Sequence, residues 1–150
     1  MSTIFWSSLT ESIHQLFEGK IETETKKIIT ATLKQEFFNA ACATGNLERV
    51  NTYLAEGLDL CVNIISVAIG YASSNGRIEI VDRLLFHESQ INLNGALYYA
   101  SCYGHIAIVD LLLKSVAGSR ITRINLLRTF CTAKNRGYTQ IEELIKSYIT

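Results

Sequence analysis

Hydrophobic positions along the chain recur at helical spacing in four similar segments. Each segment has an apolar residue and an alanine three residues apart, then a glycine, then a second stretch rich in isoleucine, leucine and valine. The glycines that align the segments are Gly45, Gly76, Gly104 and Gly137, in steps of 31, 28 and 33 residues. Self-similarity at such a period predicts a repeat array rather than one central core.

Each segment predicts two short helices joined at its glycine. The glycine ends the first helix, because the residue after a helix C-terminus commonly takes a positive φ that glycine adopts most cheaply. The second helix, as in Ile106–Leu113, has apolar residues over more than half of its circumference, so it must be covered on two sides. One helix pair cannot bury that surface alone, and we therefore expect neighbouring pairs to stack. The alanines expected between them are Ala41, Ala72, Ala100 and Ala133.

These segments resemble the ankyrin repeat family. The strongest matches, Ala100–Leu113 and Ala72–Leu85, follow the family core A-A-x-x-G-H-x-x-I-V-x-x-L-L, and Leu54–Asp59 follows L-x-x-G-A-D. The resemblance extends over about Gln35–Thr150. It implies an all-α, ankyrin-like helical solenoid of about four helix-turn-helix repeats, with approximate bounds 35–62, 63–93, 94–123 and 124–150.

The chain departs from the family pattern at the start of every repeat. The family tetrad T-P-L-H is replaced by EFFN at 36–39, VAIG at 67–70, GALY at 95–98 and RTFC at 128–131. The resemblance implies that hydrogen bonds made by the tetrad threonine and histidine are missing. The short connection at 86–94 predicts a reduced or absent β-turn finger. In the last repeat, Thr139 and Glu142 at otherwise apolar positions predict a polar capping unit.

Residues 1–34 lie outside the repeats and predict an N-terminal helical cap on the first repeat. Ser8 and Glu11 have the spacing of a helix capping box, and Gly19 is expected to end that helix. A second helix is expected over 22–33, with three residues directed inward: Ile28, Ile29 and Leu33. The alternative is that Phe5, Trp6 and their neighbours form a docking motif for another protein.

Composition supports an ordered helical protein. The 150 residues are 48% hydrophobic with balanced charge and contain no proline, so nothing interrupts long helices. No stretch approaches the roughly 20 apolar residues of a membrane span, and no secretory leader is recognised. The cysteine spacing favours neither zinc nor a disulfide framework, which indicates free thiols in a cytoplasmic, reducing compartment. These cysteines are Cys42, Cys61, Cys102 and Cys131.

A partner-binding surface is implied by the resemblance. In the family, the concave face of the first helices binds partners, and the two positions before each glycine point there. These positions are Ala43, Thr44, Ser74, Asn75, Cys102, Tyr103, Asn135 and Arg136. Tyrosine and arginine are enriched at the energetic centres of interfaces. The predicted partner site is Tyr71, Asn75, Tyr99, Tyr103, Asn135 and Arg136; the alternative for Tyr71 and Tyr99 is that they are partly buried spacers between repeats.

Charge is distributed unevenly along the chain. Residues 114–150 carry a formal charge of +5 and residues 34–113 carry −4. The basic end fits an acidic partner protein, and a solvated capping face is the alternative. Nucleic acid is disfavoured as a partner, because the whole chain has no net charge and no interleaving of aromatic and basic residues.

Catalytic chemistry is not indicated by the sequence. The three histidines lie in different segments, and no phosphate-binding loop or metal-spaced carboxylate cluster is present. Cys102 and His105 flank a glycine turn without an acid to orient the imidazole, which leaves a thiol-dependent enzyme as a remote alternative. We therefore expect a non-enzymatic protein-binding module without cofactor or metal, as a monomer or weak dimer. It is either an adaptor of its own cell or an effector directed into a host cytoplasm by an intracellular bacterium or virus.

Overall fold

The computed structural model describes residues 2–56, 62–87, 91–115 and 120–149, with side chains described from residue 19 onward except at 62 and 87. Every regular element within these ranges is a helix. By its contacts the chain divides into two units, Met1–Glu36 and Phe37–Thr150, which are described separately below. The helical fold expected from the sequence is confirmed.

Helix α1 runs without interruption from Ser2 to Thr44. The prediction that Gly19 ends a first helix is wrong, and so is the capping box, because Ser8 lies inside α1. A helical glycine costs only about 1 kcal/mol relative to alanine, and no proline follows it to stop the helix. Within the first unit there is a single helix and no inner side, so Ile28, Ile29 and Leu33 are exposed. That this segment caps the first repeat stays a prediction.

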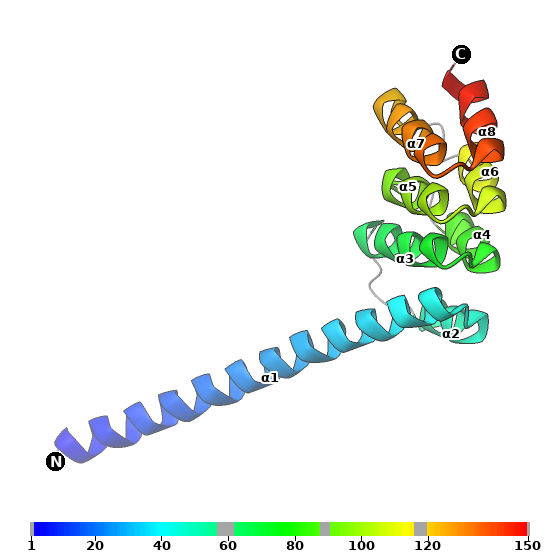
Figure 1. Cartoon of the computed structure of the whole chain (residues 1–150). Coiled ribbons are helices and arrows are strands. Elements are labelled where there is room, and N and C mark those ends of the chain that lie inside the picture. The colour runs from blue at the N-terminus through cyan, green and yellow to red at the C-terminus, as the bar shows by residue number, and fades with distance from the viewer. Residues whose placement is uncertain (1, 57–61, 88–90, 116–119, 150) are drawn as a thin grey trace. The chain divides into compact units, whose positions relative to one another are not determined.

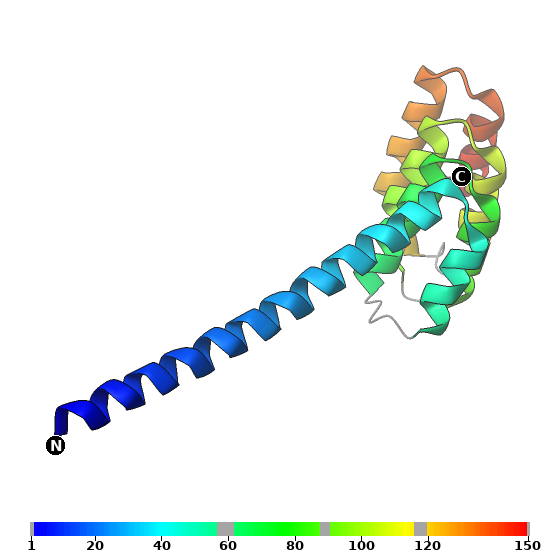
Figure 2. The same ribbon diagram turned by 90° about the horizontal axis from the view of Figure 1, so that it is seen from below.

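The second unit consists of helix pairs that stack in two layers. The last turns of α1 pair with α2 (Leu47–Ala55), and three further pairs follow: α3 (Val62–Ser74) with α4 (Ile78–His87), α5 (Asn94–Cys102) with α6 (Ile106–Lys114), and α7 (Arg123–Asn135) with α8 (Thr139–Ile149). Figures 1 and 2 show α3, α5 and α7 side by side in an inner layer and α4, α6 and α8 in an outer layer. This arrangement is the predicted array of stacked repeats.

The repeat glycines form the turns between the paired helices. Their φ angles are +83°, +70°, +78° and +76° at Gly45, Gly76, Gly104 and Gly137, as the sequence predicts. The backbone N–H of the residue after each glycine donates to the carbonyl of the repeat alanine five residues earlier, at 2.9–3.0 Å. The left-handed glycine therefore closes the first helix and directs the chain into the second.

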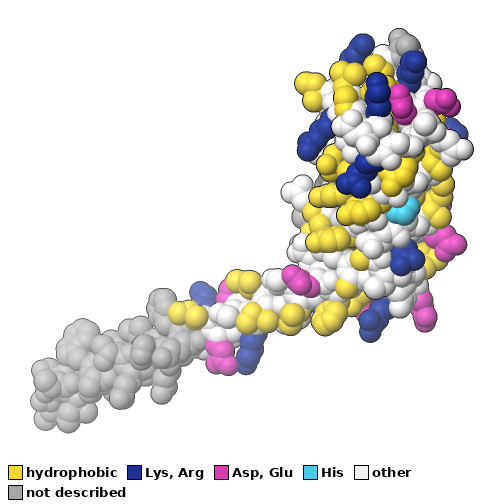
Figure 3. Space-filling model, viewed as in Figure 1, with side chains coloured by type: hydrophobic (Ala, Val, Ile, Leu, Met, Phe, Trp, Pro, Cys, Tyr) yellow, Lys and Arg dark blue, Asp and Glu magenta, His cyan; other side chains and the backbone are white. Residues whose placement is uncertain are grey.

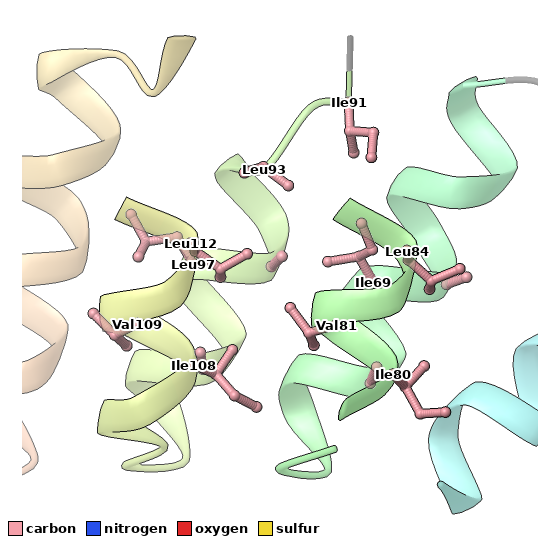
Figure 4. Close-up of a cluster of buried hydrophobic side chains, with 14 of the residues drawn as sticks. Ile69, Ile80, Val81, Leu84, Ile91, Leu93, Leu97, Ile108, Val109 and Leu112 are labelled. Carbon is pink, nitrogen blue, oxygen red and sulfur yellow. The ribbon is translucent and has the colours of Figure 1, made fainter. Parts of the chain in front are cut away.

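The core lies between the layers and between successive pairs. The four repeat alanines are buried, and so are the valines five residues after the first three glycines. Figure 4 shows Val81 and Val109 of the outer layer with Leu97 of the inner layer. Ile91 and Leu93, in the connection before α5, are also buried although the sequence analysis did not select them. The predicted change in the turn finger at 86–94 includes residues 88–90, which lie outside the described residues.

Neighbouring repeats are joined through the residue that follows each glycine. Arg77 packs over Gly45, His105 over Gly76 and Tyr138 over Gly104, so that a Cβ added at any of these glycines would lie 2.8–2.9 Å from the covering side chain. Arg77 Nε donates to the carbonyl of Ala43 at 3.1 Å, and a ring nitrogen of His105 lies 3.3 Å from the carbonyl of Ser74. These contacts link each repeat to the preceding one at a position other than the family tetrad.

Candidate partner-binding groove

A groove of about 690 Å³ lies between the inner helices α3 and α5. We call it the α3–α5 groove. Its lining residues are Asn63, Ser66, Val67, Gly70, Tyr71, Ser74, Asn92, Asn94, Gly95, Ala96, Tyr99 and Tyr103. None of them carries a charge. A hollow of this size, with an apolar wall and a few polar groups, is typical of a ligand-binding site.

Two glycines, Gly70 and Gly95, line the groove and leave space where other residues would have side chains. On α3, the groove-lining residues recur every three or four positions from Asn63 to Ser74, which places them on one face of the helix. Gly70 lies on this face, and the Tyr99 ring approaches it so closely that a Cβ at Gly70 would be 3.9 Å from Tyr99 Cδ2. On α5, an added Cβ at Gly95 would meet no atom within 4 Å. Tyr99 therefore extends across the groove toward α3.

Three tyrosines stand around the groove with large exposed areas. Tyr71, Tyr99 and Tyr103 are 49%, 46% and 57% exposed. The Tyr99 ring packs edge-on against Tyr98 at a centroid distance of 5.6 Å, and the Tyr103 ring stacks with His105 at 6.5 Å. Tyr71 and Tyr99 are thus about half exposed, which is compatible with a partner-binding role and with partly buried spacers between repeats. The rings of Tyr99 and Tyr103 have aromatic neighbours.

A smaller hollow of about 220 Å³ lies between α5 and α7. Its lining residues are Asn94, Gly95, Tyr98, Tyr99, Asn125, Arg128 and Thr129. The Arg128 guanidinium carbon lies 4.7 Å from the centre of the Tyr98 ring, a cation–π contact. A hydrogen bond with the Cys102 side chain raises the pKa of the Tyr98 phenol above its usual value. The two hollows share Asn94, Gly95 and Tyr99.

The predicted site residues fall in different places. Tyr71, Tyr99 and Tyr103 line the α3–α5 groove together. Asn75 is exposed, and its side-chain amide donates to the carbonyl of Tyr71 at 2.9 Å. Asn135 and Arg136 are exposed at the C-terminal end of α7 and line neither hollow. Among the positions expected on the concave face, Cys102 is buried, so that expectation is wrong for it.

Several groove residues were missed because their sequence positions carry no chemical signal. Val67, Gly95 and Arg128 occupy the first position of three successive tetrads, where the family has threonine. From the sequence, these tetrads indicated only that the hydrogen bonds of the family threonine and histidine are lost. Aligning them by repeat would have placed all three on the inner layer, where Arg128 is the exposed basic group that the selection of Arg136 overlooked.

The cysteine thiols Cys42 and Cys102 and the His105 imidazole pack against other parts of the fold. Burial raises the pKa of the Cys42 thiol to about 12, which disfavours the thiolate needed for nucleophilic attack. The His105 ring lies over Gly76 and beside the Ser74 carbonyl, while Cys102 is buried. Cys131 is exposed, and Cys61 lies outside the described residues. No cluster of three or more metal-ligating side chains occurs within the described part of the chain.

Comparison with known proteins agrees with this geometry. A family model described as ankyrin repeats (3 copies) matches residues 37–125. The chain belongs to the ankyrin repeat family. The ankyrin match ends within α7, and the fourth unit repeats the geometry beyond it, with Gly137 at φ +76° between α7 and α8. Comparisons with curated proteins and with solved structures gave no match.

Ankyrin repeats are general protein–protein interaction modules, which gives the groove its functional context. None of the helices in the described ranges is both long enough and apolar enough to cross a membrane.

Proposed function

We propose that this ankyrin array is a non-enzymatic module that binds another protein through the α3–α5 groove. The observation that carries the proposal is an uncharged groove bordered by three exposed tyrosines on neighbouring inner helices. Tyrosine offers a large contact area with only two side-chain torsions to restrict. A partner surface that fills the groove can bury these rings without leaving an unpaired charge.

The construction of the groove supports binding without rearrangement. Its walls are helices of the repeat array, and the Tyr99 and Tyr103 rings already pack against Tyr98 and His105. Little backbone or side-chain freedom has to be lost on binding, which lowers the entropic cost of association.

The proposal is tested by quantitative affinity capture with groove variants. Tyr71→Ala with Tyr99→Ala should lower recovery of the specific partner at least tenfold, since central aromatic residues each contribute about 2 kcal/mol or more at interfaces. Tyr148→Ala is the matched control, because Tyr148 is 43% exposed but belongs to the outer helix α8. Equal capture by the groove variant and the wild type, with both proteins folded by circular dichroism, rules out this groove as the binding surface.

We also propose that the module acts in a cytoplasm, either as an adaptor of its own cell or as an effector delivered into a host cell. The absence of the T-P-L-H tetrad from every repeat favours the delivered form by analogy with other degenerate ankyrin proteins. A translocation assay with a reporter fused to the chain separates the two. Failure of delivery in an organism with a functioning secretion system contradicts the effector form and leaves the adaptor.

A further inference from the structure

We infer that the partner segment is an extended peptide carrying a large uncharged side chain and a carboxylate three residues apart. The uncharged side chain fills the α3–α5 groove, the backbone crosses α5 at Gly95, and the carboxylate pairs with Arg128. This inference rests on the proposed function and specifies the partner that the same surface selects.

Gly95 provides the crossing point between the two hollows. It is exposed and lines both of them, and an added Cβ there would meet nothing within 4 Å. The absence of a side chain lets a peptide backbone lie against α5. Asn94 also lines both hollows, and its buried Oδ1 has no hydrogen-bond partner.

Arg128 supplies the charge that the groove itself does not have. It is exposed on α7, and within the described residues it forms no ion pair with a carboxylate. Stacking and a side-chain hydrogen bond with Tyr98 hold the guanidinium near the hollow. A guanidinium has five N–H donors, so others are left for a carboxylate. Figure 3 shows hydrophobic side chains over α3 and α5 and basic side chains toward α7 and α8. A ligand lying across these helices therefore meets an uncharged surface first and a positive one next.

The spacing of the helices fixes the spacing in the peptide. Val67, Gly95 and Arg128 occupy equivalent positions on α3, α5 and α7. Packed helices lie about 8–10 Å apart, so the groove and the second hollow are separated by one such step. A polyproline II chain, the extended form meant here, rises about 3.1 Å per residue with three residues per turn, so side chains three residues apart lie on the same face and match the step. In a β-strand, residues three apart point to opposite faces and could not make both contacts. A helical peptide would need about six residues for the same distance.

The test uses fluorescein-labelled nonapeptides that contain one tryptophan and one glutamate in a serine–proline background. The separation between the two residues is varied from one to six, in both chain directions, and binding to the full chain is measured by fluorescence anisotropy. We expect the tightest binding at a separation of three, with glutamine in place of glutamate binding roughly tenfold more weakly.

A pair of matched variants tests whether Arg128 is the residue that binds the carboxylate of the peptide. Arg128→Gln should remove the preference for glutamate over glutamine, whereas Lys134→Gln, an exposed basic position on the same helix, should preserve it. Gly95→Leu should weaken binding of the separation-three peptide at least tenfold by obstructing the crossing. Thermal melting of each variant establishes that the array remains folded, and a glutamate preference that persists in folded Arg128→Gln overturns the assignment.

The outcomes distinguish this inference from the function on which it rests. Best binding at a separation of six, with induced helicity in the peptide, overturns the extended conformation. Absence of peptide binding at millimolar concentration, together with partner capture that is lost in the Tyr71 and Tyr99 double variant, overturns the peptide chemistry but retains the groove. Partner capture that is unaffected by that double variant overturns the proposed function itself.

Discussion

At the scale of single residues, the contact between a glycine and the next repeat explains how the array holds together without the usual tetrad. Gly76 needs a positive φ, and the His105 ring occupies the space beside it. Gly137 has nearly the same φ, +76°, but nothing lies within 4 Å of its Cβ position. Substitution at Gly137 would therefore measure only the free energy of backbone strain. Substitution at Gly76 would measure that strain together with the loss of the His105 contact.

Alanine substitutions at these two glycines should give different losses of stability. Gly137→Ala is expected to lower the free energy of unfolding by about 1 kcal/mol, from left-handed backbone strain alone. Gly76→Ala should lower it by about 1 kcal/mol more, because the new Cβ displaces His105 from its position beside Ser74. Urea unfolding measures both values. Equal losses would show that the His105 contact contributes nothing. In a His105→Ala background, Gly76→Ala should cost no more than Gly137→Ala does.

Cys42 gives the stability of the array a dependence on alkaline pH. Its side chain has 0% exposure, and burial raises the pKa of the thiol to about 12. An unfolded thiol ionises near pH 8.5, so above that pH the unfolded state binds fewer protons than the folded state. The stabilising contribution is complete below about pH 8 and decreases as pH rises toward 12.

Between pH 9 and 10, Cys42 alone should lower the free energy of unfolding by about 1 kcal/mol. Urea titrations of the wild type and Cys42→Ala at both pH values measure this as the difference between their pH dependences. Cys131→Ala serves as the control, because Cys131 is exposed. The same pH dependence in wild type and Cys42→Ala would contradict the attribution to this thiol.

At the scale of elements, α1 shows how weak a local stop signal is when nothing else reinforces it. Gly19 was expected to end a helix, yet it is an interior residue of α1. The hydroxyls of Thr23 and Thr25 donate to carbonyls four residues earlier, at 2.7 Å. This spacing is that of the helix itself, so the helix continues past Gly19. By contrast, the glycines that do end helices are each followed by a helix that packs back on the first.

Gly19→Ala should therefore strengthen α1 rather than disturb it. Alanine favours a helix interior by about 1 kcal/mol over glycine, and no atom lies within 4 Å of the added Cβ. Hydrogen exchange of the full chain should slow about fivefold for amides within one turn of position 19, with unchanged exchange in α5. Exchange that is not slowed at these amides would contradict a continuous helix through position 19.

At the scale of the whole molecule, repetition made the fold predictable from the sequence. The glycines and alanines of the repeats were assigned correctly because each stands at the same place in several units, so independent observations had to agree. The binding surface is less repetitive. Tyr71, Tyr99 and Tyr103 could be selected because tyrosine is enriched at interfaces and these three stand beside the repeat alanines and glycines, whereas Gly70 and Gly95 contribute to the groove by having no side chain.

Arg128 and Arg136 illustrate why the basic residue of the binding surface could not be identified from the sequence. Both are exposed basic residues of the last repeat, and composition cannot distinguish them. Only the packing of α7 beside α5 places Arg128 over Tyr98, which is 30 residues away in the chain. The sequence also could not indicate that the side chains of Ile91 and Leu93, in the connection before α5, are buried in the core. Neither residue stands at a position that recurs in the repeats.

The contact that covers the first three repeat glycines has a consequence for the evolution of such a chain. One side of this contact is backbone at a glycine, and the covering side chain is a guanidinium at Arg77, an imidazole at His105 and a phenol ring at Tyr138. A duplicated or relocated repeat carries its own covering side chain. The repeat before it in the chain has a glycine backbone of the same conformation for that side chain to pack against. The array can therefore lengthen, shorten or exchange units without matched substitutions at this contact, and its groove residues are free to diverge.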